Sequence, residues 1–170
     1  MRNKLIMVLG TAFLLALLSV GAQAQKYYTY GERTLIPYGF EDWALYYSYQ
    51  GGAYVNSTTS EYSYFIPVEI PDGEIVRYMR LIYYDNAAET YQYLDANFYR
   101  INMWTGVWEK IYGVDTKGVA ADLPQTKVDL SPEESARTKI INSACSYVIT
   151  VYFNYASSDL RFIGVVLVTY

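Results

Sequence analysis

The chain of 170 residues contains no histidine and a single cysteine, Cys145. Without histidine, Ser-His-Asp and Cys-His catalytic arrangements are excluded, and so are zinc, copper and non-haem iron sites that use imidazole ligands. One cysteine forms no disulfide within the chain, so packing must stabilise the fold. Cys145 lies in an apolar run, which predicts a buried and inert thiol, with pairing to a second chain as the alternative.

Other catalytic motifs are missing as well. The sequence has no G-x-S-x-G turn, S-x-x-K pair, G-x-G-x-x-G turn or P-loop. A glycoside hydrolase, however, needs only two carboxylates across a cleft. The candidate acidic pairs are Glu41 with Asp42, Asp72 with Glu74, and Glu133 with Glu134. Acids so close together in a turn or helix start usually face solvent or the helix dipole. We therefore predict a protein that is not an enzyme and uses no cofactor, with a carboxylate-based glycoside hydrolase as the enzymatic alternative.

Long apolar runs are absent except near the amino terminus. There, Arg2 and Lys4 precede an apolar run over residues 5–20, and the small residues Ala22-Gln23-Ala24 follow it. This layout is typical of a secretory signal peptide with an A-x-A cleavage site. The run is shorter than the roughly 18 to 20 residues that span a membrane, so an uncleaved anchor is the weaker alternative. We expect a signal peptide at residues 1–24, a single domain at residues 25–170, and a bacterial protein that is secreted, periplasmic or on the cell surface.

Positive charge is also scarce. The chain has 13 basic and 17 acidic residues, and removing Arg2 and Lys4 with the signal peptide leaves 11 against 17, a net charge of −6. Nucleic acids require a basic face, so the charge disfavours them as partners.

What the predicted domain does contain is tyrosine, 21 in all, with many β-branched residues and little helical periodicity. Turn-forming clusters divide it into short runs, which predicts an all-β fold, an antiparallel, jelly-roll-like β-sandwich of about eight strands. The clearest expected strands cover residues 62–70, 75–85, 93–103, 107–114, 147–155 and 160–170. The sequence leaves open whether residues 25–30 form a loose tail or a strand lent to a neighbour.

Local signals refine these strands. The turn Trp104-Thr105-Gly106 predicts a hairpin between residues 93–103 and 107–114. Pro67 cannot donate a backbone hydrogen bond, so its strand should be an edge or a bulge there. Ser131-Pro132-Glu133-Glu134 fits a capping box and predicts a short helix. In the last strand, alternation places apolar residues on both faces. One face carries Phe162, Val166 and Val168, and the other carries Ile163, Val165 and Leu167. This pattern predicts a strand covered on both faces.

Several short motifs occur in a recognisable order: IPVEIPDGE at 66–74, LIYYDN at 81–86, ANFYR at 96–100, YVI at 147–149, and a last strand ending in Tyr170. This series resembles secreted bacterial single-domain, jelly-roll-like β-sandwich proteins that carry an LPDG-type turn before a YYYDN-type strand. Here Ile70 replaces the Leu of the turn. The resemblance covers about residues 36–170 and implies the fold and export, without a particular reaction or ligand.

The surplus of tyrosine suggests a binding surface, because a tyrosine ring is apolar while its hydroxyl prefers water. The candidate aromatic surface consists of Tyr78, Tyr84, Tyr91, Tyr93, Tyr99, Trp104 and Trp108. Exposed rings favour a structural or interaction module that assembles or adheres to proteins outside the cytoplasm. A carbohydrate-binding β-sandwich in which Tyr and Trp stack on sugar rings is one alternative, and cross-strand pairs that only stabilise the sheet are another.

Two further alternatives follow from the same residues. A signal peptide, many tyrosines, about eight strands and a terminal aromatic residue also suit a small outer-membrane β-barrel, although the last strand lacks the required alternation. A weak calcium site is conceivable at Asp85, Asn86, Glu89 and Asp95, but their spacing matches no calcium-binding repeat. We expect Asp85 and Asn86 to shape a turn instead, and we predict no metal.

Overall fold

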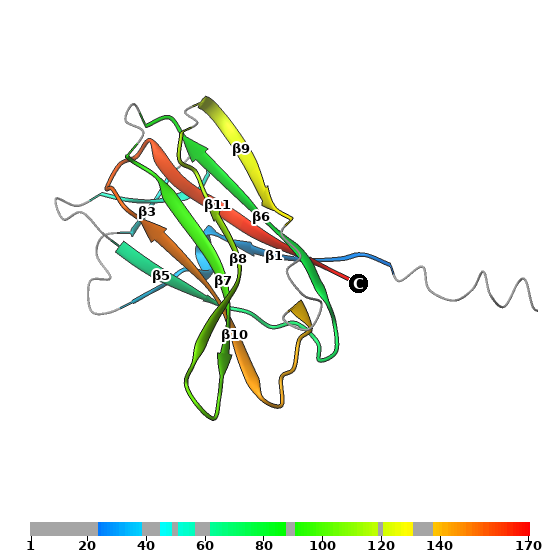
Figure 1. The fold of residues 1–170 in the computed structure, drawn as a ribbon. Coiled ribbons are helices and arrows are strands. Elements are labelled where there is room, and N and C mark those ends of the chain that lie inside the picture. Colours follow the sequence, from blue (N-terminus) through cyan, green and yellow to red (C-terminus); the bar gives the residue numbers. More distant parts are fainter. Residues whose placement is uncertain are drawn as a thin grey trace, which may run out of the picture.

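Two antiparallel sheets pack face to face in the computed structural model (Figure 1). The structure describes residues 24–38, 45–48, 51–56, 62–87, 91–118, 121–130 and 138–170. The six-stranded sheet contains β1 (Lys26–Gly31), β3 (Leu45–Tyr47), β4 (Ala53–Val55), β6 (Val76–Asp85), β9 (Ala121–Asp129) and β11 (Leu160–Thr169), in the order β3-β4-β11-β6-β9 with β1 also paired to β11. The five-stranded sheet contains β2 (Ile36–Pro37), β5 (Tyr62–Pro67), β10 (Cys145–Phe153), β7 (Leu94–Asn102) and β8 (Trp108–Asp115), in the order β2-β5-β10-β7-β8.

The chain crosses repeatedly between the sheets. From β5 onward each strand lies in the sheet opposite the one before it, except that β7 and β8 form a hairpin within one sheet. These findings confirm the predicted all-β, antiparallel, jelly-roll-like sandwich. Because the described strands belong to two separate sheets, they do not support a small outer-membrane β-barrel.

Eleven strands are described, more than the predicted eight or so. The longest unexpected strand is β9. Its polar sequence and Pro124 are typical of a loop. Among the described strands β9 pairs with β6 alone, so it lies at the edge of its sheet, where a proline is tolerated. The remaining additions, β2 to β4, are two or three residues long and pair with longer strands.

The core consists of the inward-facing residues of both sheets. The largest fully buried side chains include Phe98, Phe153 and Phe162. In β6, Met79 and Leu81 face the core and alternate with the less buried Tyr78, Arg80 and Ile82. The burial of these rings and aliphatic side chains supplies the main stabilisation of a chain without disulfides.

The prediction for the last strand was wrong in register. The pairing of β11 with β6 shifts between Phe162 and Gly164, which is a β-bulge. The extra residue reverses the alternation, so Phe162, Val165 and Leu167 belong together in the core. Val166 points away from this core cluster and is nevertheless buried, so the expectation of a strand covered on both faces is confirmed.

The β7–β8 hairpin is confirmed, and its turn is held by Asn102. The side-chain Oδ1 of Asn102 accepts hydrogen bonds from the backbone N–H groups of Trp104, at 2.9 Å, and Thr105, at 3.0 Å. Pro67 also lies as predicted, because it pairs with Val148 of β10 on one side, whereas the pairs with β2 involve only Tyr64 and Phe65.

The first strand, β1, pairs with β11 of the same chain along its whole length. A short 3₁₀ turn, η1 (Glu32–Thr34), connects it to β2. The described part of the segment left open by the sequence is therefore an ordered strand, seen in Figure 1 beside β11.

Some predictions fall outside the described residues. These are the signal peptide, apart from Ala24, and the helix start at residues 131–134. No helix in the described ranges is both long and apolar enough to cross a membrane.

Candidate functional site

The outer face of the five-stranded sheet, defined as the face turned away from the core, gathers aromatic and polar side chains. In β7, Ala96 and Phe98 are buried in the core, so Asn97 between them and Tyr99 after them face outward. The same alternation and the strand register bring Thr150 of β10 opposite Asn97 on this face. Strands far apart in the sequence thus contribute to one surface.

An aromatic strip runs across this outer face. We define it as the linked rings of Tyr38, Phe65, Trp108 and Tyr99. Ring centroids lie 4.9 Å apart for Tyr38 and Phe65, 6.1 Å for Phe65 and Trp108, and 5.6 Å for Trp108 and Tyr99. Tyr38 and Trp108 are exposed, and the indole of Trp108 has an exposed fraction of 49%. The strip therefore offers apolar ring surface to solvent.

The contact between Phe65 and Trp108 requires the side chains to converge. These residues lie on β5 and β8, and β10 and β7 separate the two strands. Three strand spacings would amount to about 14 Å along a flat sheet. The two ring centroids are only 6.1 Å apart, so the side chains lean toward each other across the intervening strands β10 and β7.

Beside the strip, the polar residues Asn97 and Lys110 lie close to Gly113. Asn97 is only 7% exposed, and its buried Oδ1 atom has no hydrogen-bond partner among the residues that the structure describes. Gly113 is the residue opposite Asn97 on β8. A Cβ atom on Gly113 would lie 2.5 Å from Asn97 Oδ1 and 3.0 Å from Lys110 Nζ. The side chains of Asn97 and Lys110 thus already fill the space over Gly113, which explains why this position has no side chain of its own.

A second aromatic pair lies at the other end of this face. Tyr93 and Tyr152 have ring centroids 6.5 Å apart, and Lys117 Nζ lies 4.1 Å from the centroid of Tyr93. Asp95 faces Asp115 across β7 and β8, and Asp115 forms a 3.2 Å ion pair with Lys127. Burial, followed by the charge of Asp95, raises the pKa of Tyr99, which keeps this phenol neutral and able to donate a hydrogen bond.

The structure brings some of the predicted aromatic residues together and separates others. Tyr99 and Trp108 are in contact, and Tyr93 lies beside the start of β7 in the same sheet. Tyr78 and Tyr84 belong to β6 in the opposite sheet, where Arg80 and Arg161 lie over their rings at 5.9 Å and 4.3 Å. Tyr91 contacts Tyr155, and Trp104 stands at the tip of the β7–β8 hairpin with an exposed fraction of 83%.

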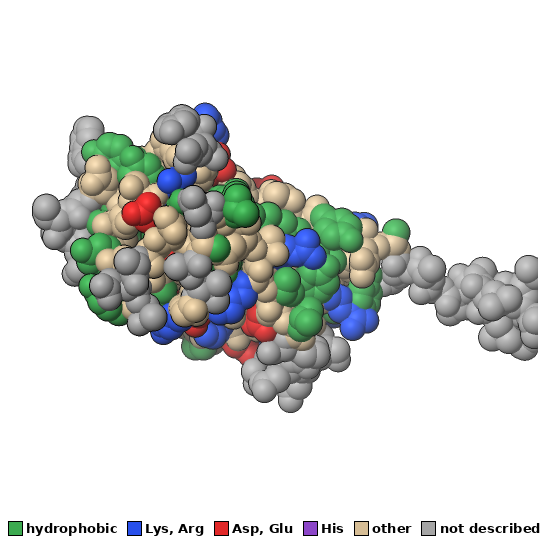
Figure 2. All heavy atoms as spheres, turned by 90° about the horizontal axis from the view of Figure 1, so that it is seen from above, with side chains coloured by type: hydrophobic (Ala, Val, Ile, Leu, Met, Phe, Trp, Pro, Cys, Tyr) green, Lys and Arg blue, Asp and Glu red, His purple; other side chains and the backbone are tan. Residues whose placement is uncertain are grey.

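Hydrophobic side chains are also dispersed on the face of the molecule that Figure 2 shows. Figure 2 shows them in several groups, with Lys and Arg side chains beside some of these groups. The continuous chain of ring contacts on the outer face is therefore more informative than the number of exposed rings.

Sequence reasoning missed Tyr38, Phe65, Asn97 and Lys110. Phe65 could have been found, because it alternates with the apolar residues Tyr64 and Ile66 and must face the other way. The role of Asn97 had no local signal, since its exceptional feature is an unpartnered oxygen atom that only the packing of three strands reveals.

The candidate metal residues do not assemble in the part of the chain that the structure describes. Asp85 is buried and its Oδ1 accepts a hydrogen bond from the backbone N–H of Ala87 at 3.1 Å, as expected for a turn. Burial raises the pKa of Asp85, against an opposing effect of hydrogen bonds from Thr116 and Ala87. Asp95 lies in the other sheet, and Glu89 is outside the described ranges. The described residues contain no group of three or more Cys, Asp or Glu side chains that could hold a metal ion.

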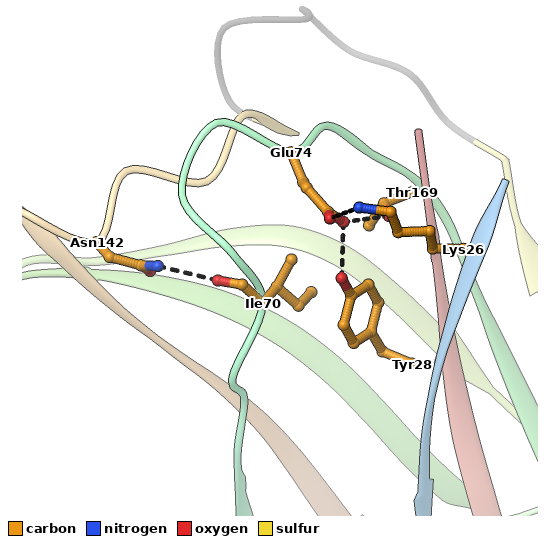
Figure 3. A network of polar contacts seen from close by, with 6 residues as sticks. All are labelled: Lys26, Tyr28, Ile70, Glu74, Asn142 and Thr169. Carbon is orange, nitrogen blue, oxygen red and sulfur yellow. Dashed lines mark hydrogen bonds and ion pairs between the residues drawn. The ribbon is translucent and has the colours of Figure 1, made fainter. Parts of the chain in front are cut away.

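The acidic pair Asp72 and Glu74 is engaged in structural contacts. Asp72 Oδ1 accepts a 2.7 Å hydrogen bond from the backbone N–H of Asn142. Glu74 accepts hydrogen bonds from Lys26, Tyr28 and Thr169 (Figure 3). These contacts hold the two carboxylates in separate networks, and the other acidic pairs lie outside the described residues. Cys145 is a buried free thiol, as predicted.

A hollow of about 680 Å³ opens where β5 ends and β10 begins. Its lining includes Pro67, Pro71, Met103 and Ser146. The lining is largely apolar, although Glu69 and Asn142 also contribute to it. The outer face is the stronger candidate because it carries linked, exposed aromatic rings.

Comparisons with known proteins place the fold among solved β-sandwiches. No protein-family model and no curated protein sequence matches this chain. A solved xylan-binding module, CBM15, is similar with a TM-score of 0.53 at 8% identity, over 86% of this chain and 97% of that one. CBM28, a module specific for non-crystalline cellulose, has a TM-score of 0.36 at 9% identity, over 84% of this chain and 83% of that one. A family 11 carbohydrate-binding module from Clostridium thermocellum, in complex with a β-1,3-1,4-mixed-linked tetrasaccharide, has a TM-score of 0.35 at 11% identity, over 89% and 90% of the two chains. The similarity to CBM15 confirms the β-sandwich fold.

Proposed function

We propose that this protein is a non-catalytic carbohydrate-binding module whose glycan site is the outer face of the five-stranded sheet. The observation that carries the proposal is the aromatic strip. In it, the ring centroid of Trp108 lies 6.1 Å from that of Phe65 and 5.6 Å from that of Tyr99. The fold supports it, because a solved protein of similar fold is a xylan-binding module.

The chemistry of the strip suits a sugar ring. One face of a pyranose presents C–H groups, which pack on an aromatic ring, while its edge presents hydroxyl groups. The outer face offers hydrogen-bonding groups beside the rings, including Thr150 and Lys110, which can contact those hydroxyls. An aromatic strip without polar neighbours would suit a purely apolar ligand instead.

The proposal includes a place of action outside the cytoplasm, where polysaccharides are found. It is motivated by the signal-peptide pattern at residues 1–24. The assembly or adhesion surface expected from the excess of tyrosine stays a prediction, and a sedimentation experiment separates it from glycan binding.

The test uses affinity electrophoresis and titration calorimetry with soluble xylan, mixed-linked β-glucan and cellulose derivatives. Trp108→Ala removes the ring that connects β8 to β5, and we expect it to weaken binding about 30-fold or more. Trp104→Ala is the matched control, because Trp104 is also an exposed tryptophan but stands at the hairpin tip. We expect its affinity to equal that of the wild type.

Two outcomes would contradict the proposal. One is a wild-type protein that binds none of these polysaccharides, and the other is an equal loss in the Trp104→Ala variant. A concentration-dependent oligomer in sedimentation velocity, together with no glycan binding, would favour the assembly reading.

A further inference from the structure

We infer that the outer face of the six-stranded sheet is a second binding surface, and that its ligand is an acidic polysaccharide whose uronate carboxylates pair with Arg80. We call this surface the Arg80 face and define it by Tyr27, Tyr78 and Arg80, with Val166 and Val168 beneath them. The inference goes beyond the proposed function, because the Arg80 face belongs to the other sheet and takes a different class of ligand.

Strand register places these residues on one side of the sheet. Val166 and Val168 of β11 point away from the core cluster. Tyr27 of β1 and Tyr78 of β6 lie opposite Val168 on its two sides, and Tyr27 is 59% exposed. Arg80 of β6 lies opposite Val166. The Arg80 face therefore combines two tyrosine rings and a guanidinium group over a floor of valine.

Carboxylates are missing from this face in the part of the chain that the structure describes. The predicted domain has a net charge of −6, so a face without acids departs from its average. The acidic side chains described in the strands of this sheet are those of Asp85 and Asp129. Asp85 is buried opposite the core residue Leu160, and Asp129 accepts a 2.9 Å hydrogen bond from the backbone N–H of Gly113 in the other sheet. Both carboxylates thus point between the two sheets.

Arg80 is a cation without a protein anion on this face. Among the described residues it forms no ion pair, and its guanidinium carbon lies 5.9 Å from the ring centroid of Tyr78. Arg161, also on β11 and β6's side of the sheet, instead donates hydrogen bonds to the carbonyl oxygen of Ser158 at 2.6 Å and to Ser48 Oγ at 3.2 Å. A guanidinium presents N–H donors in a planar fork that matches the two oxygens of a carboxylate. The geometry of Arg80 therefore favours an external carboxylate.

The neighbouring rings favour a sugar as the carrier of that carboxylate. A uronic acid has its carboxylate on the edge of a pyranose ring, and the C–H groups of a pyranose pack on an aromatic ring. A uronate residue stacked on Tyr78 can therefore present its carboxylate to Arg80, because the guanidinium lies beside that ring. An acidic peptide would supply the carboxylate without a ring to stack, and a neutral sugar would leave Arg80 without an anion.

The experiment measures binding of polygalacturonate and of neutral xylan by affinity electrophoresis and titration calorimetry. We expect the wild type to bind polygalacturonate although both molecules are anionic overall, because the Arg80 face is locally free of described carboxylates. Arg80→Gln should weaken this binding about 10-fold or more, and Arg80→Lys, which keeps the charge but loses the fork, should weaken it less. Neither variant should change the affinity for xylan.

Arg33→Gln is the matched control. The guanidinium carbon of Arg33 also lies 5.9 Å from a tyrosine ring centroid, that of Tyr47. Tyr47 lies opposite the core residue Ala53, so this pair is not on the outer face. We expect Arg33→Gln to bind polygalacturonate like the wild type. Trp108→Ala should likewise retain polygalacturonate binding, because Trp108 belongs to the five-stranded sheet. The melting temperature of each variant checks its fold.

Several outcomes would overturn the inference. A wild type that does not bind polygalacturonate would do so and leave the proposed function to the xylan measurement. Equal losses in Arg33→Gln and Arg80→Gln would show diffuse charge attraction instead of a site. Tighter binding of dextran sulfate than of polygalacturonate would contradict the assignment to a carboxylate, and equal affinity for polyglutamate would contradict the assignment to a sugar. Binding of polygalacturonate without binding of any neutral polysaccharide would instead overturn the proposed function and leave this inference standing.

Discussion

At the scale of single residues, a glycine in β11 allows the backbone of β1 to approach closely. Gly164 follows the β-bulge in β11 and pairs with Gly31 of β1. A Cβ atom on Gly164 would lie 2.8 Å from the carbonyl oxygen of Tyr30, whereas a Cβ atom on Gly31 would meet nothing within 4 Å. Two glycines that face each other across the same pair of strands thus have different roles.

This difference predicts unequal effects of one added methyl group. We expect Gly164→Ala to lower the free energy of unfolding by about 1 to 3 kcal/mol, because β1 must move away from β11. Gly31→Ala, the matched control, should change it by less than about 0.5 kcal/mol. Urea unfolding followed by tryptophan fluorescence measures both, and an equal loss in the two variants would refute the explanation.

At the scale of elements, one carboxylate of a connecting segment joins side chains of β1 and β11, in addition to their backbone pairing. Glu74 precedes β6, is 8% exposed, and accepts hydrogen bonds from Lys26 and Tyr28 of β1 and from Thr169 of β11 (Figure 3). Burial by itself would raise the pKa of Glu74, but the hydrogen bonds from Lys26, Thr169 and Tyr28 outweigh it and lower the pKa below its ordinary value. The ionised form therefore holds the first strand against the last one.

The Glu74 network predicts that β1 loosens when the charge is removed. Glu74→Gln keeps the shape but loses the charge, so we expect faster amide hydrogen exchange in Lys26–Gly31 than in the wild type. The loss of net stability should be about 1 to 3 kcal/mol, because buried Thr169 loses a charged acceptor. Glu69→Gln is the control, since Glu69 is an exposed acid close in sequence.

The same network sets an acid dependence. A carboxylate with a lowered pKa in the folded state stabilises above its unfolded value of 4.5, and this stabilisation is lost as the pH falls through the folded value. Exchange in β1 of the wild type should therefore approach that of Glu74→Gln as the pH falls below 4.5 and through the lowered pKa of folded Glu74. A β1 exchange rate that is equal in both proteins at pH 7 would show that Glu74 does not hold the strand.

At the scale of the whole molecule, buried phenols make the sandwich sensitive to alkali. Burial raises the pKa of Tyr112 to about 12, with the charge of Asp129 acting in the same direction. Burial likewise raises the pKa of Tyr30 to about 12, although a backbone contact to Glu69 opposes the rise. Tyr112 is 1% exposed and donates a 3.0 Å hydrogen bond to the carbonyl oxygen of Val76, so its ionisation requires the two sheets to separate.

Stability should accordingly fall above pH 10. The unfolded chain releases its phenolic protons near pH 10, whereas folded Tyr112 retains its proton to about pH 12, so each unit of pH in this window favours unfolding. We expect Tyr112 to account for about 2 to 3 kcal/mol of the loss between these pH values. Tyr112→Phe should unfold with a shallower alkaline dependence, while Tyr27→Phe, which removes the hydroxyl of an exposed ring, should not change it. Denaturant unfolding at pH 8, 10, 11 and 12 provides the measurement, and identical slopes for all three proteins would contradict the assignment.

The fold was more predictable than the site. The alternation of Met79, Leu81 and Tyr83 with outward residues, and the turn around Gly106, depend on neighbours in sequence, so β6 and the β7–β8 hairpin could be read from the chain. The register of β11 could not, because its bulge inserts a residue that only the pairing with β6 reveals. β9 was missed because its polar residues are tolerated at a sheet edge, which is a property of strand order.

The sequence by itself determined the all-β class, the β7–β8 hairpin, the lack of imidazole chemistry, and an excess of tyrosine beyond what one core can bury. These are properties of composition and of contacts between neighbouring residues. Only the tertiary structure decided which rings meet, because Phe65 and Trp108 are brought together by the order of four strands in one sheet. It also decided that Asn97 packs against Gly113 with its Oδ1 atom buried, since the pairing of β7 with β8 and β10 sets the distance between atoms that are far apart along the chain.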